Sequence, residues 1–272
     1  MTNSADRELT DAALQFIKAV LREAGRLALA VREAVGEVQL KADATPVTRV
    51  DREIETLLVA HIGRVFPRHR ILAEEGSSGG GDSSFLWVID PLDGTRAYLS
   101  GLPIWGISVG LLRNGAPLAG AFYLPAVNEL YWGDGQIAFL NDKPLSPPTA
   151  GLDSRFTFLA VPSNWHLEYE ISFERLRSLG STAAHLVYVA RGAAIGALTR
   201  RVRIWDLAGV LPVLQPLGIE LRYLSGAPFA VEALLAGEQI PEPILAAPAH
   251  LLDPLRAMIH PKPARADLPA PQ

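Results

Sequence analysis

The segment at residues 87–95, Trp-Val-Ile-Asp-Pro-Leu-Asp-Gly-Thr, restricts the possible folds more than any other feature of the chain. Its apolar start predicts a strand that delivers Asp90 at its C-terminal end, and Pro91 then turns the chain. Asp93 follows three residues after Asp90, directly before a glycine and a helix-compatible run. Two carboxylates are therefore expected at one turn. Taken alone, the pattern is equally well explained as an ordinary turn, because Asp, Pro and Gly favour turns for conformational reasons.

Two further acidic segments bear on this turn. Glu74 and Glu75 end an expected strand at residues 70–73, and Asp206 starts an expected helix within the sequence IWDLA. Considered one at a time, the two glutamates are better explained as a solvated strand end. Asp206 is likewise better explained as a helix N-cap, a position where aspartate is favoured.

Together, the three segments resemble the inositol monophosphatase family, whose signature is similar to WVIDPLDGT followed far downstream by WD-x-A-G. The resemblance extends over most of the chain, from KADATPVTRVD through GSTAAHLVYVARG to WDLAG. It implies a layered α+β fold, an αβαβα sandwich of the inositol monophosphatase and fructose-1,6-bisphosphatase type. It also implies a homodimer with a metal site between two halves of the chain.

The resemblance implies a role for each matching residue. The implied ligands of two or three Mg²⁺ ions are Glu74, Asp90, the carbonyl of Leu92, Asp93 and Asp206. The implied catalytic residues are Glu74, Thr95 and Asp51. The implied contacts of the substrate phosphate are Asp93, Gly94, Thr95 and Asp206.

Two of the matching residues have a simpler explanation without the resemblance. In the family, Asp51 would accept a hydrogen bond from the Thr95 hydroxyl, which with Glu74 orients the attacking water. On its own, Asp51 is better explained as a first-turn helix carboxylate. Lys41 matches a lysine on the family's mobile loop, and on its own it is a solvated loop lysine.

The residue types fit the chemistry that the resemblance implies. Mg²⁺ is a hard cation that prefers oxygen ligands, and the lack of neighbouring His or Cys in these segments disfavours zinc. Two such ions could grip a phosphate monoester, activate a water and stabilise the leaving alkoxide. Gly94 and Thr95, at the start of a helix, would offer backbone N–H groups to the phosphate.

Composition narrows the alternatives. The 25 Lys and Arg against 29 Asp and Glu give a formal charge of −4, which argues against binding to nucleic acid. The chain has no cysteine, which excludes disulfides, Cys-ligated zinc, iron–sulfur clusters and a thiol nucleophile. Charges interrupt the N-terminal segment, and the sixteen-residue uncharged run between Arg96 and Arg113 is too short to span a bilayer. We therefore expect a cytoplasmic protein without a membrane partner.

Apolar spacing and turn residues predict the elements. Helices are expected at 9–34 and 51–65, the second with Thr48 as N-cap and Asp51 completing a capping box. An antiparallel meander is expected from runs at 70–73, 85–89, 107–112, 119–124 and 129–132. Loops are expected at 41–47 and 77–84. The second half is expected to contain a strand at 155–161, helices at 167–179, 183–197 and from Asp206 onward, and strands at 219–224 and 244–246.

These elements predict a mixed α+β architecture with two subregions that meet near Leu145. The expected division is residues 1–145, with most of the metal ligands, residues 146–261, which complete the site, and a flexible tail at 262–272.

The resemblance weakens near the expected substrate pocket. Inositol-specific members carry an acidic residue where this chain has Thr199, and many relatives carry Asp where it has Ile195. Four arginines, which could meet a second phosphate or carboxylate but are more commonly explained as an exposed charge run, are Arg191, Arg200, Arg201 and Arg203. The helix after Asp206 is expected to kink at two prolines, Pro212 and Pro216.

The sequence thus predicts a Mg²⁺-dependent, lithium-sensitive phosphomonoesterase that acts on a small phosphorylated metabolite of the inositol or sugar phosphate class. Histidinol phosphate and 3′-phosphoadenosine 5′-phosphate remain open as substrates. The alternative of another class is a catalytically inactive phosphate-binding protein.

Overall fold

A computed structural model describes residues 4–32, 38–41, 46–153 and 155–263. Its α-helices are α1 (Ser4–Val31), α2 (Arg49–Val65), α3 (Thr95–Leu99), α4 (Trp165–Glu168), α5 (Thr182–Ala190), α6 (Ile204–Ala208), α7 (Leu211–Leu214) and α8 (Leu252–Arg256). Short 3₁₀ helices are η2 (Pro125–Val127), η3 (Gln215–Leu217), η4 (Val231–Leu234) and η5 (Ala249–Leu251). The last residues of the expected first helix, most of the expected loop at 41–47 and most of the expected tail lie outside the described residues.

The strands form two large sheets and two short ribbons. The strands of the N-terminal half are β1 (Gln39–Leu40), β2 (Pro46–Val47), β3 (Arg70–Ala73), β4 (Ser78–Gly79), β5 (Phe85–Asp93), β6 (Gly106–Arg113), β7 (Ala116–Leu124), β8 (Glu129–Gly133), β9 (Ala138–Leu140) and β10 (Lys143–Pro144). Those of the C-terminal half are β11 (Phe158–Ala160), β12 (Tyr169–Ile171), β13 (Leu176–Arg177), β14 (Ala194–Thr199), β15 (Ile219–Tyr223), β16 (Ile244–Pro248) and β17 (Ile259–Pro261).

Helix α2 begins where its capping residues predict. The Thr48 hydroxyl accepts a hydrogen bond from the Val50 N–H at 3.1 Å, and the Asp51 carboxylate accepts one from the Thr48 N–H at 2.8 Å. These bonds satisfy N–H groups that have no partner inside the helix. The predicted capping box is therefore confirmed, and it fixes the position of Asp51 in the first turn of the helix.

The eight-stranded sheet has the order β10-β9-β8-β7-β6-β5-β3-β4. From β5 to β8, sequential strands pair antiparallel, which confirms the predicted meander over these strands, and β9 and β10 extend it. The run at 70–73, expected as the first strand of that meander, is instead β3, which pairs parallel to β5. The segment at 77–84, expected to be a loop, contributes the short edge strand β4. Central strand β5 is buried along nearly its whole length, which explains its continuous apolar sequence.

The five-stranded sheet, in the order β13-β11-β14-β16-β15, corrects two predicted helices. The expected helix at 183–197 ends at Ala190, because Gly192 adopts a left-handed φ of 76° and the chain then enters β14. The break was not predicted, because the residues on both sides of Gly192 are similarly apolar and show no change of periodicity that would separate a helix from a strand. The expected helix at 167–179 is wrong as well, since β12 pairs with β17 and β13 with β11.

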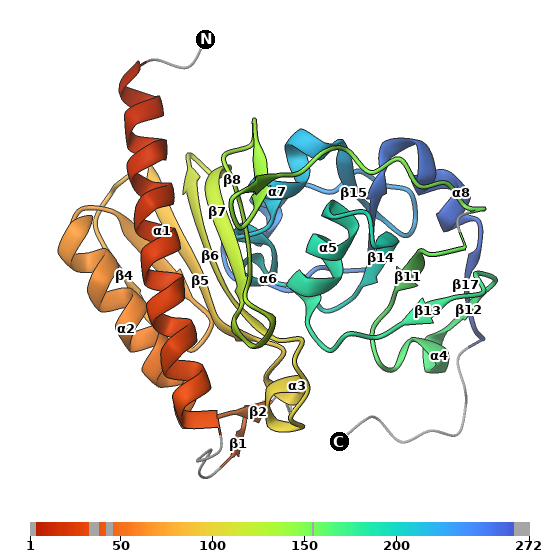
Figure 1. Ribbon diagram of the computed structural model, residues 1–272, viewed down its shortest axis with the longest axis horizontal. Coiled ribbons are helices and arrows are strands. Elements are labelled where there is room, and N and C mark those ends of the chain that lie inside the picture. Colours follow the sequence, from red (N-terminus) through yellow and green to blue (C-terminus); the bar gives the residue numbers. More distant parts are fainter. Residues whose placement is uncertain (1–3, 33–37, 42–45, 154, 264–272) are drawn as a thin grey trace.

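The elements stack as five alternating layers (Figure 1). Helices α1 and α2 cover the outer face of the large sheet, while α5, α6 and α7 lie between the two sheets. Helix α8 packs on the outer face of the second sheet, against β16. The hydrophobic core between the sheets includes residues of both, among them Val88 of β5 and Ala197 of β14. This is the layered α+β sandwich that the sequence predicts.

Helix α6 lies unusually close to the large sheet. A Cβ added at Gly110 of β6 would lie 2.3 Å from the carbonyl oxygen of Ala208, and one added at Gly209 would lie 2.4 Å from the Ser108 hydroxyl. Only glycine permits such an approach. The C-terminal end of α6 is thereby held against strand β6.

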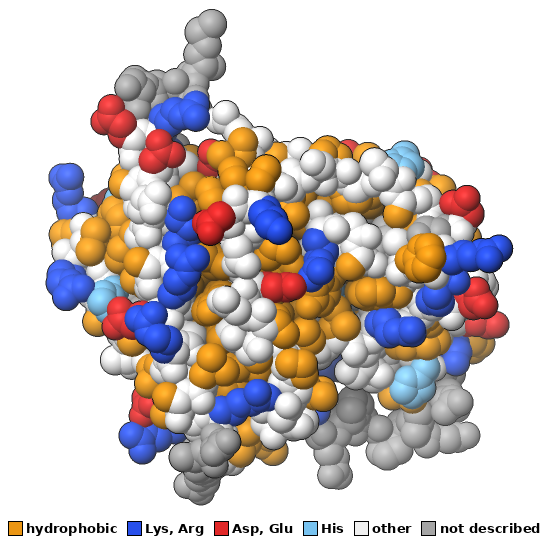
Figure 2. Space-filling model, viewed as in Figure 1, with side chains coloured by type: hydrophobic (Ala, Val, Ile, Leu, Met, Phe, Trp, Pro, Cys, Tyr) orange, Lys and Arg blue, Asp and Glu red, His pale blue; other side chains and the backbone are white. Residues whose placement is uncertain are grey.

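The surface of the protein is mixed in character. On the face drawn in Figure 2, positive and negative side chains are interspersed among hydrophobic ones, and neither sign of charge dominates. Within the described part of the chain, no helix combines the length and the apolar character needed to cross a bilayer.

Candidate active site

The site is built around the end of strand β5, which delivers Asp90 and Asp93. Both side chains are buried, and Asp90 accepts a hydrogen bond from the Leu92 N–H at 2.9 Å. Pairing with β6 shifts register between Asp90 and Asp93, because the Pro91 turn interrupts the ladder. The strand continues to Asp93 instead of ending at the predicted residue 89, and the irregularity lets both carboxylates face the same side.

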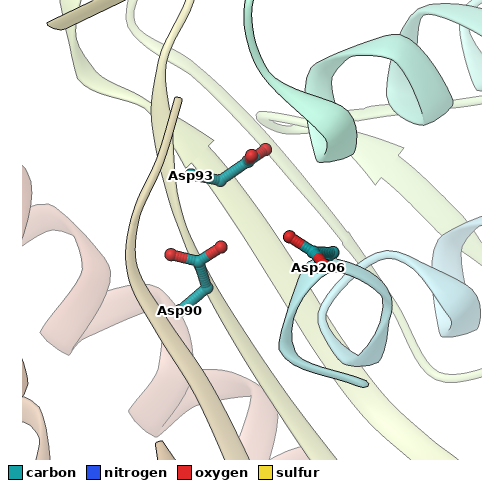
Figure 3. A group of neighbouring side chains, drawn as sticks. All are labelled: Asp90, Asp93 and Asp206. Carbon is teal, nitrogen blue, oxygen red and sulfur yellow. The ribbon is translucent and has the colours of Figure 1, made fainter. Parts of the chain in front are cut away.

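Helix α6 adds the third carboxylate of the site. Asp206 is not the N-cap that its position alone suggests. Arg203 is the N-cap of α6, and the Asp206 carboxylate, three residues further on, accepts a hydrogen bond from the Arg203 N–H at 2.6 Å. Its other oxygen is free to face β5. Carboxylate oxygens of Asp90, Asp93 and Asp206 lie within 4.8 Å of one another, and the three side chains converge on one space (Figure 3). The turn and the distant helix are thus brought together, as predicted.

Burial and mutual repulsion raise the pKa values of the three aspartates. Burial, together with repulsion from neighbouring carboxylates, raises the pKa of Asp90 and of Asp206 well above the ordinary range. Burial raises the pKa of Asp93 to about 6, although hydrogen bonds from Ser181, Thr182 and Ala183 act in the opposite direction. A buried group of like charges is costly without a counter-ion, and a bound cation would relieve that cost.

Asp93 is anchored by helix α5, a contact that sequence reasoning missed. Its carboxylate accepts hydrogen bonds from the Ser181 hydroxyl at 2.5 Å, the Thr182 N–H at 3.0 Å and the Ala183 N–H at 2.7 Å. Ser181 is also the N-cap of α5, where its hydroxyl accepts from the Ala184 N–H. The Ser-Thr-Ala-Ala sequence signals a helix start, but no sequence signal names Asp93 as its partner.

Glu74 and Glu75 share one lysine. The Lys41 Nζ atom lies 2.7 Å from a carboxylate oxygen of each glutamate. Burial and repulsion from Glu74 raise the pKa of Glu75 to about 7, although Lys41 opposes that shift. Glu74 lines the same pocket as the three aspartates, so the predicted ligand lies at the site but is paired with an ammonium group.

A buried glutamate, Glu55, which sequence reasoning missed, holds the loop after Glu74. The Glu55 carboxylate of α2 accepts hydrogen bonds from the Glu75 N–H at 2.8 Å and the Ser77 N–H at 3.0 Å. Its place on the buried face of an amphipathic helix is the only signal that the sequence offers.

The structure places the predicted pair Asp51 and Thr95 in contact. The Thr95 hydroxyl lies 3.1 Å from a carboxylate oxygen of Asp51 and 3.1 Å from the Leu92 carbonyl. Burial raises the pKa of Asp51, against hydrogen bonds from Thr48 and Thr95. Asp51 is therefore both a cap of α2, as its position alone suggests, and a partner of Thr95.

Gly94 permits the turn from β5 into α3. Its φ of 93° lies in the left-handed region, and an added Cβ would lie 2.9 Å from the Gly180 carbonyl. Thr95 then opens α3 beside the three aspartates, with its side chain held by Asp51. Glycine is required here for both the backbone angle and the close approach.

The three aspartates, together with Gly94 and Thr95, line a cavity of about 270 Å³. Its lining includes the acidic residues Glu74, Asp90, Asp93 and Asp206, and also Thr199 and Arg200. Ile195, the other departure from the family pattern, packs instead in the core outside the second sheet. Pro212 and Pro216 occupy the first turns of α7 and η3, where proline is tolerated, so the chain after Asp206 forms the separate segments α6, α7 and η3 instead of the expected kinked helix.

His185 also lines this cavity, but its contacts argue against a role as metal ligand. Its Nε2 atom accepts a hydrogen bond from the Leu179 N–H at 3.0 Å. Burial lowers the pKa of His185 to about 4, so the ring is neutral near pH 7. His185 therefore supports the loop before Ser181.

Comparisons with known proteins identify a family whose members include phosphatases. A family model described as "Inositol monophosphatase family" matches residues 5–245. The chain is 31% identical over 214 residues to a fructose-1,6-bisphosphatase/inositol-1-monophosphatase of Aquifex aeolicus, covering 74% of this chain and 81% of that protein. It is 32% identical over 217 residues to a histidinol-phosphatase of Chlorobaculum parvum, covering 75% and 83%.

Solved structures with similar folds also include members of this family. An IMPase of Thermotoga maritima superposes with a TM-score of 0.79 at 27% identity, covering 91% of this chain and 96% of that one. The suhB protein of Bartonella henselae superposes with a TM-score of 0.78 at 25% identity, covering 91% and 98%. The chain therefore belongs to the inositol monophosphatase family of phosphoric monoester hydrolases.

Proposed function

We propose that the protein is a Mg²⁺-dependent phosphomonoesterase that hydrolyses a small phosphorylated metabolite of the inositol or sugar phosphate class. The observation that carries this proposal is the convergence of Asp90, Asp93 and Asp206 within 4.8 Å in a cavity that Gly94 and Thr95 also line. The family membership and the names of the relatives support the reaction class.

The donor set suits Mg²⁺. The proposed ligands, all of them oxygen donors, are Glu74, Asp90, the carbonyl of Leu92, Asp93 and Asp206. Two or three ions held there would neutralise the phosphate charge, lower the pKa of an attacking water and stabilise the leaving alkoxide. The raised pKa values of the aspartates support this assignment, because a cation would compensate the charge that burial disfavours.

The protein's own groups would orient the water and the phosphate. The Thr95 hydroxyl has a single proton, and donating it to Asp51 leaves the oxygen lone pairs able to accept a hydrogen bond from water. Glu74 would accept the second hydrogen bond and hold the water in line with the leaving oxygen. Among the groups proposed to meet the phosphate are the Gly94 and Thr95 N–H groups, together with Asp93 and Asp206.

A second candidate substrate follows from the relatives. One similar protein of Chlorobaculum parvum and one of Mycobacterium tuberculosis are named histidinol-phosphatase. Histidinol phosphate carries a cationic amine, whereas inositol and sugar phosphates are neutral apart from their phosphate. Measured selectivity between these substrates will therefore distinguish the two candidates.

The test is phosphate release from inositol 1-phosphate, fructose 1,6-bisphosphate, histidinol phosphate and 3′-phosphoadenosine 5′-phosphate, with Mg²⁺ or with a chelator. We expect turnover that the chelator abolishes, and a loss of at least about a hundredfold in Asp93→Asn, because that change removes a charged ligand. Binding of phosphate without turnover of any substrate would instead identify a catalytically inactive phosphate-binding protein.

Lithium sensitivity and a homodimer are further parts of the proposal that rest on family membership. Lithium is expected to inhibit phosphate release, and light scattering is expected to give twice the mass of the chain. Turnover that persists at high lithium concentration would remove the first expectation, and a monomeric mass would remove the second.

A further inference from the structure

The structure separates the four arginines that the sequence groups together. Arg191 pairs with Glu129 at 2.7 Å, and Arg203 donates a hydrogen bond to the Gly237 carbonyl at 2.6 Å. Arg201 is exposed and does not line the cavity of the candidate site. Arg200 does line it. Of these four, Arg200 is thus the one placed to meet a substrate.

Arg200 is held in an unusual way. It directly follows the last residue of β14, and its side chain is only 12% exposed. The Nη1 atom lies 2.6 Å from a carboxylate oxygen of Glu168, yet within the described structure this buried nitrogen has no hydrogen bond of acceptable geometry. The ion pair with Glu168 occupies this nitrogen, so an anionic ligand could reach it only by displacing Glu168.

Glu168, the counter-ion of Arg200, is more exposed than the arginine and can move into water more easily. The Glu168 side chain is 43% exposed and ends the short helix α4. A carboxylate with this exposure can return to water at small cost, since exposed ion pairs contribute little. Leaving the guanidinium unpaired would be expensive, so Glu168 can leave only if another anion replaces it.

The wall of the cavity around Arg200 suits such an anion. All four acidic residues that line the cavity belong to the proposed metal site, and the rest of the polar lining includes the hydroxyls of Ser163, Ser178, Thr182 and Thr199. A guanidinium among hydroxyl groups recognises carboxylates and phosphates through charge-assisted hydrogen bonds.

We propose that Arg200 determines specificity, by favouring phosphate monoesters whose leaving group carries a second anionic group, either a carboxylate or a second phosphate. That group takes the place of Glu168 beside the guanidinium. The proposal rests on the proposed function, since it concerns the leaving group of the same reaction. Thr199 is compatible with such a substrate, because a carboxylate at this position of the cavity lining would repel it.

Matched pairs of substrates test the proposal. 3-Phosphoglycerate differs from glycerol 3-phosphate by a carboxylate, and fructose 1,6-bisphosphate differs from fructose 1-phosphate by a second phosphate. The measured quantity is the ratio of kcat/KM within each pair, with Mg²⁺. We expect the ratio to exceed one in at least one pair, and the responding pair identifies the anion.

Three variants separate recognition from a structural ion pair. Arg200→Gln should lower the ratio about tenfold, as expected for loss of a charge-assisted hydrogen bond. Glu168→Gln should raise the ratio, because it removes the competing anion. The neighbouring exposed Arg201→Gln serves as the control and should leave the ratio unchanged. If the ion pair is purely structural, Arg200→Gln and Glu168→Gln will both lower thermal stability and neither will change the ratio.

A binding measurement separates failure of this inference from failure of the proposed function. Calorimetry compares binding of fructose 1,6-bisphosphate with that of fructose 1-phosphate, and of 3-phosphoglycerate with that of glycerol 3-phosphate, with Ca²⁺ in place of Mg²⁺. Turnover of glycerol 3-phosphate or fructose 1-phosphate, which carry no second anionic group, without an Arg200-dependent preference for their partners overturns the inference alone. Absence of all turnover overturns the proposed function, and tighter binding of the doubly anionic ligands that Arg200→Gln abolishes would still support the inference.

Discussion

At the residue scale, the geometry of the site depends on groups that hold the carboxylates as much as on the carboxylates themselves. Asp93 accepts three hydrogen bonds from the start of α5, so its rotation is restricted before any cation binds. Groups that orient a ligand in this way commonly affect metal affinity strongly. Ser181 is the only side chain among the three donors, and it can therefore be tested by mutation.

Ser181→Ala is expected to weaken Mg²⁺ binding about tenfold, because Asp93 loses a charge-assisted hydrogen bond. The variant should also lose about 1 kcal/mol of unfolding free energy, because α5 loses its N-cap. Mg²⁺ titration of activity and of binding measures the first effect. Ser181→Thr keeps a hydroxyl and is the matched control. Equal Mg²⁺ affinities in Ser181→Ala and the wild type would show that the two N–H groups position Asp93 without help.

Lys41 is expected to compete with Mg²⁺ for Glu74. Its ammonium group lies 2.7 Å from the carboxylates of Glu74 and Glu75, so a cation that binds Glu74 must displace it. Lys41→Met should therefore tighten Mg²⁺ binding several-fold, whereas Lys41→Arg should not. Calorimetric titration with Mg²⁺ measures the difference. Weaker binding in Lys41→Met would indicate that the lysine organises the glutamates for the metal instead of competing with it.

The sequence predicted the acidic members of the site better than their supports. Asp90, Asp93 and Asp206 were found because their residue type and their family motif both point to metal chemistry. Glu55 and Ser181 were not found, because a buried glutamate and a helix N-cap acquire their role only from the loop or strand that folding brings against them.

At the element scale, prediction succeeded where turn residues or capping residues mark the ends of an element. The meander from β5 to β8 alternates with clear turn residues, and α2 begins with a complete capping box. Prediction failed between residues 183 and 197, where a helix and a strand of similar apolar composition are joined at Gly192. Burial on all sides removes the alternation that would distinguish them.

The close packing of α6 on the large sheet gives a testable prediction. A Cβ at Gly110 would lie 2.3 Å from the Ala208 carbonyl, so Gly110→Ala must displace α6 and with it Asp206. We expect a loss of about 1–3 kcal/mol of unfolding free energy, together with weaker Mg²⁺ binding. Denaturant unfolding and Mg²⁺ titration measure the two effects.

Gly63→Ala is the matched control for this change. Gly63 lies exposed in helix α2, and no atom lies within 4 Å of an added Cβ. The substitution should stabilise the protein by about 0.5–1 kcal/mol through helix propensity, without affecting Mg²⁺ binding. If Gly110→Ala behaved like Gly63→Ala, the glycine contacts would not determine the position of α6.

At the scale of the whole molecule, we propose two subdomains, residues 1–145 and 146–261, that unfold together. The core between the sheets joins Val88 and Phe122 of the first with Ala197 and Ile244 of the second, through the helices between them. Tryptophan fluorescence, to which the five tryptophans of both subdomains contribute, and far-ultraviolet circular dichroism should therefore report one coincident urea transition. Two separate transitions would show that the halves are stable independently.

The carboxylates of the site are also expected to set the pH dependence of stability. Burial raises the pKa of Asp93 from 3.8 to about 6, so between these values the folded, metal-free protein binds more protons than the unfolded chain. Its unfolding free energy therefore falls as pH rises through this range, and Asp90 and Asp206 act in the same direction. His185, with its pKa lowered from 6.5 to about 4, acts in the opposite direction, since its contribution is lost as pH falls.

The difference in melting temperature with and without Mg²⁺ isolates the carboxylates, because the contribution of His185 is common to both conditions. At the proposed site Mg²⁺ would compete with protons for Asp90, Asp93 and Asp206, so the stabilisation by saturating Mg²⁺ should be small near about pH 5 and grow toward about pH 8. Thermal unfolding at intervals across that range, with Mg²⁺ or with a chelator, measures it. Asp93→Asn should reduce both the stabilisation and its dependence on pH, because one titrating ligand is removed. Stabilisation that stays constant from acid to neutral pH would show that the cation binds elsewhere, since binding at these aspartates requires that they first lose their protons.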